Sequence, residues 1–149
     1  MDTRHLAPLL VVALFSVTAG AAGAEAVRVI APEDLHYVAD ARAPGAAIAV
    51  VTGDPKAAGP YTIRARLAAG ATTPAHRHPD TRTVTVLSGR YFFATGTRYD
   101  AGALTAYGPG TVIVVPSGVA HFSAALDGET LVQESGLGPT ALEPVTPER

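Results

Sequence analysis

The sequence predicts an all-β fold, built as a barrel or as a sandwich of two sheets. Short apolar or alternating segments recur along the chain, and no long segment repeats its apolar residues at the helical period. The 149 residues include Gly 15 and Pro 12, which break these segments at close intervals, as tight turns between short strands require. Hydrophobic residues make up 48% and charged residues 16%, a composition that supports a packed core and argues against disorder.

The first 24 residues have the layout of a secretory signal peptide. A short polar start with Arg4 and His5 precedes an apolar run at residues 9–15, and small residues end in an A-x-A site at Ala24. Cleavage after Ala26 is a second possibility, and an uncleaved membrane anchor is the alternative interpretation. We therefore expect residues 25–149 to form a single domain that is periplasmic or secreted. The sequence has Cys 0, which excludes disulfides, thiolate ligands and a cysteine-linked lipid.

The first half of this expected domain contains two well-defined strands and two weaker elements. Residues 27–30 are a brief strand candidate, and residues 32–38 begin with a proline and two acids, which favour a short helical turn. Residues 46–52 form an apolar strand that ends at a Gly-Asp-Pro turn. Residues 61–67 alternate, and this predicts a core face and a second face that we assign to solvent. The core face holds Ile63, Ala65 and Leu67, and the solvent face Tyr61, Arg64 and Arg66.

The second half contains four more strand candidates. They are residues 83–87, which alternate, residues 90–95, which are aromatic, residues 111–115, which are apolar, and residues 129–134. Residues 99–106 could form a helical turn, although Gly102 weakens it. The proline-rich tail from residue 138 onward should be extended or loose. The barrel core is therefore expected at about residues 45–138.

Three histidines are placed where a metal site could form. His76 and His78 are two positions apart, so on a strand both imidazoles point to the same face. His121 follows the predicted strand at 111–115 and, like the first pair, stands next to glycine and proline. His36 is isolated in the sequence. Neutral imidazoles suit transition metals, and three protein ligands with open positions are typical of a catalytic site.

The spacing around these histidines resembles the two motifs of the cupin superfamily. The first motif is matched by Gly70-x5-His76-x-His78-x3-Arg82-x6-Gly89, and the second by Gly110-x5-Pro116-x-Gly118-x2-His121. The resemblance implies a small jelly-roll barrel, a double-stranded β-helix, with His76, His78 and His121 as ligands of a divalent transition metal, Fe, Zn, Mn or Ni. It also implies a homodimer formed through an edge strand.

The sequence departs from the cupin motifs at two positions. Arg82 stands where the family has a glutamate ligand, and Ala125 stands where the second motif has an asparagine. Arg82 shares its parity with Val84 and Val86, so it should lean into the barrel. There it would repel a divalent ion by roughly 5 kcal/mol at about 6 Å and an effective dielectric of about 20.

Three outcomes could compensate the positive charge of Arg82. An anionic ligand could bridge the metal and the guanidinium, which is a natural fork for a carboxylate. The side chain could instead swing outward to meet Asp80 or another acid. Finally, the barrel could lack a metal, with the histidines lining a pocket.

Further residues are candidates for the wall of the pocket. Gln133 could point inward and offer an amide oxygen, while Glu134 is assigned to the opposite face. Tyr91 and Phe93 share parity and could form an aromatic wall, with ordinary core packing as the alternative. None of these residues is an obvious general base.

The predicted function is that of an exported metal-binding cupin that acts on a small, anionic or chelating molecule. The resemblance implies a three-histidine site similar to those of some non-haem dioxygenases, and the missing base favours oxygen chemistry over a metal-dependent isomerase or lyase. A binding protein without turnover is the other alternative, so whether the chain is an enzyme stays open. The formal net charge of -2 and the lack of a basic stripe argue against nucleic acid and anionic membranes as partners.

Overall fold

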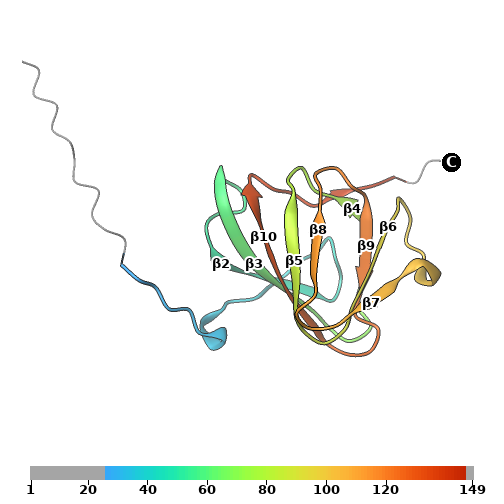
Figure 1. Cartoon of the computed structure of the whole chain (residues 1–149), viewed down its shortest axis with the longest axis horizontal. Helices are drawn as coiled ribbons and strands as arrows, with labels where there is room; N and C mark the ends of the chain where they lie inside the picture. The colour runs from blue at the N-terminus through green and yellow to red at the C-terminus, as the bar shows by residue number, and fades with distance from the viewer. Residues whose placement is uncertain (1–25, 147–149) are drawn as a thin grey trace, which may run out of the picture.

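Residues 26–146 form two antiparallel sheets that pack face to face in a computed structural model (Figure 1). Two short 3-10 helices, η1 (Pro32–Asp34) and η2 (Ala101–Ala103), interrupt the strands. The strands are β1 (Val38–Ala39), β2 (Ala46–Thr52), β3 (Gly59–Leu67), β4 (Thr72–Arg77), β5 (Arg82–Ser88), β6 (Tyr91–Thr95), β7 (Thr105–Tyr107), β8 (Val112–Val115), β9 (His121–Ala124), β10 (Thr130–Gly138) and β11 (Glu143–Pro144).

The strand order in both sheets differs from the chain order. One sheet runs β1-β2-β3-β10-β5-β8 and the other β11-β4-β9-β6-β7. Every pairing within them is antiparallel. The chain therefore passes repeatedly between the sheets, as in a jelly roll, and the predicted all-β barrel is confirmed.

The core lies between the two sheets and is filled by alternate residues of the strands. In β5, Arg82, Val84 and Val86 are buried, whereas the threonines between them are only half-buried. The same alternation puts Ile63, Ala65 and Leu67 of β3 inside, as predicted. The main buried cluster consists of Ala65, Leu67, Val84, Val86, Tyr91, Phe93, Val115, Ala125 and Val132.

Two sequence predictions about elements need correction. Residues 27–30 form no strand, and Val27 and Val29 are 94% and 88% exposed, because no neighbouring strand pairs with this segment. Only Ala101–Ala103 of the helical turn predicted at 99–106 is helical, and the following residues pair with β6 as β7. The tail, by contrast, takes the extended one of its two predicted forms, since β10 continues to Gly138 and β11 pairs with β4.

An irregularity in β4 decides which way the first histidine points. Simple alternation from the buried Thr73 would place residue 76 on the outer face. The β4–β9 register shifts between Thr73 and His76, however, and His76 becomes buried opposite His121 of β9. A bulge of this kind re-aims side chains, and here it turns an imidazole into the barrel.

The predicted signal peptide at residues 1–24 lies outside the residues that the structure describes. Within residues 26–146, no helix has the length and apolar character needed to cross a membrane.

Candidate metal centre

Three buried histidines meet inside the barrel, at the ends of two paired strands. His76 is the last residue but one of β4, His78 is the first residue after that strand, and His121 is the first residue of β9. Their candidate ligand atoms all lie within 4.8 Å of one another, and the ring centroids are 4.3 to 5.3 Å apart. The sequence-predicted trio is therefore assembled from two distant parts of the chain.

A main-chain carbonyl fixes the orientation of each imidazole. The Nδ1 atoms of His76, His78 and His121 lie 2.7, 2.7 and 2.9 Å from the carbonyl oxygens of Pro74, Ala141 and Val119. A carbonyl can only accept, so each Nδ1 carries the proton and each Nε2 keeps its lone pair free. This is the outer-partner arrangement that orients histidine ligands around metals.

The environment keeps all three rings neutral. Burial lowers the pKa of His76 to about 4, and the charges of His121, Arg82 and Arg42 act in the same direction. Burial together with the charge of Arg82 lowers the pKa of His78 to about 3. The pKa of His121 is also lowered, chiefly by burial. A neutral imidazole is the form that binds a metal ion, so the rings are ready as ligands at neutral pH.

The donor set fits a divalent transition metal. Two nitrogens that bind one ion at about 2.1 Å are separated by roughly 3.0 to 3.4 Å, and the candidate ligand atoms, which lie within 4.8 Å of one another, come close to that spacing. Three neutral nitrogen ligands suit zinc, iron or nickel and leave positions open for a small molecule. The residues present therefore fit the metal that the motif implies.

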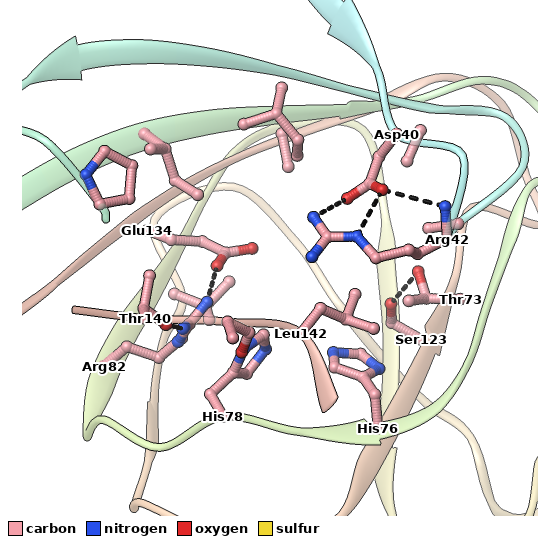
Figure 2. A pocket seen from close by; sticks show the side chains of 18 of the residues that line it. Asp40, Arg42, Thr73, His76, His78, Arg82, Ser123, Glu134, Thr140 and Leu142 are labelled. Atoms are coloured by element: carbon pink, nitrogen blue, oxygen red, sulfur yellow. Dashed lines mark hydrogen bonds and ion pairs between the residues drawn. The ribbon is translucent and has the colours of Figure 1, made fainter. Parts of the chain in front are cut away.

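The histidines form one wall of a cavity of about 360 Å³ (Figure 2). Arg82, Glu134 and Thr140 line another part of it, and Tyr91 contributes an aromatic ring. Charged side chains of the segments before β2 and β3 also line it, namely Asp40, Arg42 and Lys56. The volume suits a small organic molecule.

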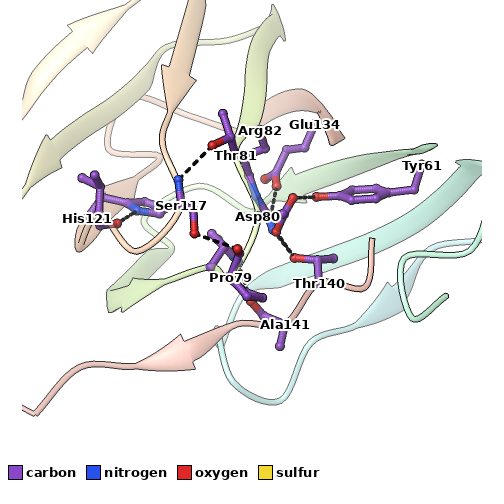
Figure 3. A network of polar contacts seen from close by, with 12 residues as sticks. Tyr61, Pro79, Asp80, Thr81, Arg82, Ser117, His121, Glu134, Thr140 and Ala141 are labelled. Carbon is purple, nitrogen blue, oxygen red and sulfur yellow. Dashed lines mark hydrogen bonds and ion pairs between the residues drawn. The ribbon is translucent and has the colours of Figure 1, made fainter. Parts of the chain in front are cut away.

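Arg82 points inward, and two acidic side chains hold its Nη atoms, while its buried Nε has no hydrogen-bond partner among the described residues (Figure 3). The side chain is 3% exposed, with Nη1 donating to Glu134 Oε2 at 2.8 Å and Nη2 donating to Asp80 Oδ1 at 2.8 Å. Thr140 also bonds to both Arg82 and Asp80. The second outcome is met in part, because the arginine pairs with Asp80 but does so without swinging outward. Two carboxylates compensate the positive charge that would otherwise repel a metal ion.

Asp80 is the buried centre of this network. Tyr61 donates its hydroxyl proton to Asp80 Oδ2 at 2.6 Å. Burial alone would raise the pKa of Asp80, but the bonds from Thr140, Tyr61 and Arg82 outweigh it and hold this pKa below its usual value. Asp80 is therefore a carboxylate at neutral pH, and its charge balances that of Arg82.

The predicted roles of Gln133 and Tyr61 were wrong. Gln133 points away from the cavity, where its Oε1 accepts a hydrogen bond from Arg64 at 3.3 Å, and its neighbour Glu134 faces inward instead. The buried Val132 has the parity of Glu134, which fixes this assignment. Tyr61 is not on the solvent face, since it shares the parity of Ile63 and is 1% exposed.

The two aromatic candidates take different places. Tyr91 is buried and lines the cavity. Phe93 lies behind the histidines, with its ring centroid 5.3 Å from that of His121, and it belongs to the main core cluster. Phe93 therefore packs against a candidate ligand and is not part of the cavity wall.

Sequence reasoning missed the contributions of two segments outside the motifs. Thr140 and Ala141 reach the site from the segment after β10, and Asp40 and Arg42 reach it from the segment after β1. Neither segment has a motif or a periodicity that points to the cavity. Their places depend on the long-range pairing of β11 with β4 and of β1 with β2.

Comparison with known proteins agrees with this geometry. Residues 63–132, which contain both histidine motifs, match the family model described as "Cupin domain". The chain is a cupin. Comparison with curated proteins found no match.

Solved structures with the same fold include several cupins. The polyketide cyclase RemF of Streptomyces resistomycificus has 17% identity and a TM-score of 0.69, over 83% of this chain and 89% of that chain. A cupin-2 domain protein of Rhodospirillum rubrum has 17% identity and a TM-score of 0.62, over 82% and 81%. KdgF of a Halomonas species has 18% identity and a TM-score of 0.58, over 81% and 96%. At these identities, the likeness establishes the shared fold.

Proposed function

We propose that this cupin is a metal-dependent enzyme that moves a proton on a small anionic molecule bearing a chelating pair of oxygens. The observation that carries the proposal is Glu134, a carboxylate that lines the same cavity as the three histidines and is held by Arg82. The preference for oxygen chemistry at the sequence level depended on the absence of a base. Because Glu134 faces inward, that premise no longer holds.

Each residue has a defined part in this reaction. His76, His78 and His121 would hold the ion through Nε2. A bound divalent metal supplies Lewis acidity, which makes the C–H bond next to a substrate carbonyl more acidic. Glu134 takes the proton at a carboxylate oxygen and returns it to a neighbouring atom of the substrate, so no oxidant is consumed. Arg82 donates to Oε2 of Glu134 and thereby fixes the direction of the base.

The test is hydrogen–deuterium exchange on a simple probe. Pyruvate offers a chelating oxygen pair and C–H bonds next to a carbonyl, and its exchange in D2O is followed by proton NMR. We expect protein loaded with zinc, manganese, nickel or iron to accelerate exchange over the same metal in buffer. Glu134→Gln should reduce this acceleration by about 100-fold or more, within the range of acid–base catalysis.

The matched control is Glu129→Gln, which removes a carboxylate that is exposed and paired with Arg66 outside the cavity. It should leave the exchange rate unchanged. If Glu134→Gln exchanges as fast as the unmodified protein, Glu134 is not the base.

A dioxygenase is the second candidate, favoured by the donor set itself. Three neutral imidazoles without a carboxylate ligand resemble the three-histidine sites of some non-haem dioxygenases. The discriminating measurement is oxygen uptake by iron-loaded protein with diketones, thiols or phenolic acids. Uptake with product formation supports oxygenation, whereas ligand binding with neither uptake nor exchange supports a binding protein.

Export and dimerisation are two further parts of the proposal. We infer that the chain is exported to the periplasm or secreted, on the basis of the signal-like residues 1–24. We infer a homodimer from the edge strand β8, whose Val112 and Val114 are exposed. N-terminal sequencing of the mature protein tests the first inference, and light scattering of purified protein tests the second.

A further inference from the structure

Two positive side chains that lie outside both motifs line the cavity. Arg42 comes from the turn between β1 and β2, and Lys56 from the turn between β2 and β3. We infer that Arg42, assisted by Lys56, binds a carboxylate on the substrate at a part of the cavity wall outside the histidine cluster. The substrate then has an oxygen-chelating head and an anionic tail. This inference rests on the proposed function, which places the head at the histidines.

The guanidinium of Arg42 is held in place but keeps donors available. Asp40 Oδ1 accepts from Nε of Arg42, and Asp40 Oδ2 accepts from Nη2, both at 2.9 Å. A guanidinium carries five N–H donors in a planar fork, so these two bonds leave the Nη1/Nη2 edge for a second carboxylate. In Figure 2 the guanidinium of Arg42 extends in the direction of Glu134, with the Asp40 carboxylate above it. Asp40 thus fixes the orientation of the fork and leaves its outer edge unused.

The two partners of this ion pair differ in exposure. The Asp40 side chain is 11% exposed and the Arg42 side chain 56%, so the bidentate pair anchors the guanidinium while much of its surface stays accessible. Lys56 makes no ion pair with any residue in the described range 26–146. Both cations are therefore available at the cavity, and an incoming anion would release only water from them.

A metal ion would give the cavity an excess of positive charge. The cations Arg42, Lys56 and Arg82 are balanced by the three acids Asp40, Asp80 and Glu134, and the three histidines are neutral. A divalent ion at the histidines would therefore add a net positive charge. Inside the cavity, Arg82 is already committed to Asp80 and Glu134, so it cannot serve the tail. Arg42 and Lys56 are the cations left for it.

The experiment compares two probes that share a chelating head. Catechol offers two oxygens and no carboxylate, while 3,4-dihydroxyphenylacetate adds a carboxylate at the far end of the ring. Binding of both to zinc-loaded full-length protein is measured by isothermal titration calorimetry at low and moderate salt. We expect the carboxylate to tighten binding by about tenfold or more, with the gain shrinking as salt rises.

The variants assign this gain to particular residues. Arg42→Met should remove most of the carboxylate preference and leave catechol binding within about twofold, because an exposed arginine at the cavity is not part of the fold's core. Lys56→Met should remove a smaller part. The control is Arg90→Met, which removes an exposed arginine that is paired with Asp127 and lies outside the cavity. It should change neither affinity.

The possible failures are distinguishable. If catechol binds but the carboxylate adds nothing, or if the preference survives in Arg42→Met, the inference is wrong and the proposed function stands. If neither probe binds zinc-loaded protein, the chelating role of the histidine site fails, and the inference fails with it.

Discussion

The two walls of the cavity are built on opposite principles. In the histidine wall, each side chain is oriented by a main-chain carbonyl, from Pro74, Val119 and Ala141, and the rings are neutral. In the arginine wall, a charged side chain is held by other side chains, chiefly Asp80 and Glu134. The first wall belongs to the sheet that contains β4 and β9, and Arg82 belongs to β5 of the other sheet.

This difference indicates which wall tolerates substitution. A main-chain carbonyl stays in place when neighbouring side chains change, so the histidine geometry depends on the fold and not on any single outer partner. The arginine wall has no main-chain partners of this kind, so removing one charged side chain leaves the others buried and unpaired. We therefore expect substitutions in the histidine wall to reduce metal binding, and substitutions in the arginine wall to reduce the free energy of unfolding.

The largest effect is expected for a histidine ligand. His121→Ala removes one of the three nitrogen ligands. Metal affinity should fall by more than about 100-fold, because losing a ligand costs more than losing a group that only hydrogen-bonds to a ligand. Metal content after dialysis, measured by mass spectrometry, should drop to background while the circular dichroism stays unchanged. His36→Ala is the control and should keep its metal. Stoichiometric metal in His121→Ala would remove His121 from the ligand set.

The next effect is expected in the arginine wall. Arg82→Met leaves the buried Asp80 without its charged partner, and the free energy of unfolding should fall by about 3–5 kcal/mol. Urea denaturation of metal-free protein measures this loss. Arg90→Met breaks an exposed pair with Asp127, 2.7 Å in length, and should cost less than about 1 kcal/mol. Equal losses in the two variants would contradict the contrast between the walls.

Acid should weaken the metal-free protein through the histidine wall. The pKa values of His76 and His78 are lowered to about 4 and about 3 in the folded protein. Between these values and the ordinary histidine pKa, the two imidazoles are protonated in the unfolded chain and neutral in the folded protein. Stability is therefore complete above the ordinary histidine pKa of about 6.5 and falls as the pH drops below it, by about 2 kcal/mol at pH 5 for each of the two. Urea midpoints measured from pH 8 to pH 5 check this, and a flat profile would show that the rings are not buried as neutral groups.

The smallest effect is expected for one hydroxyl of the arginine wall. Tyr61→Phe removes one donor from Asp80, and the free energy of unfolding should fall by about 1–2 kcal/mol. Tyr107→Phe is the matched control at a half-buried tyrosine of β7 whose hydroxyl has no hydrogen-bond partner within residues 26–146, and it should change stability by less than about 0.5 kcal/mol. Similar values for both would show that the Tyr61 bond adds nothing.

The sequence predicted the residues whose positions follow from local rules. The two glycine-bounded motifs identified the three histidines, and alternation with Val84 and Val86 placed Arg82 inside. A strand needs only its own parity for such predictions, provided that its buried face is unambiguous. The inward direction of His76, in contrast, depends on the β4–β9 register shift, which the i and i+2 spacing does not reveal.

The remaining residues could not be predicted because their positions depend on distant strands. In β10, Leu131 and Val132 are adjacent apolar residues, so either parity was possible, and the pairing with β5 shifts register between them. Gln133 was therefore chosen in place of Glu134. Ala141 and Arg42 reach the cavity only because β11 and β1 pair with partners far along the chain.

The bond between His78 and the carbonyl of Ala141 joins residues 63 positions apart, and it has a practical consequence. In an unfolded or partly degraded chain the imidazoles are far apart, whereas in the folded barrel three of them are held in place and point toward one common position. Metal should therefore bind the native state far more tightly than the denatured one. The ratio of bound metal to protein in a preparation would then report how much of that preparation is correctly folded.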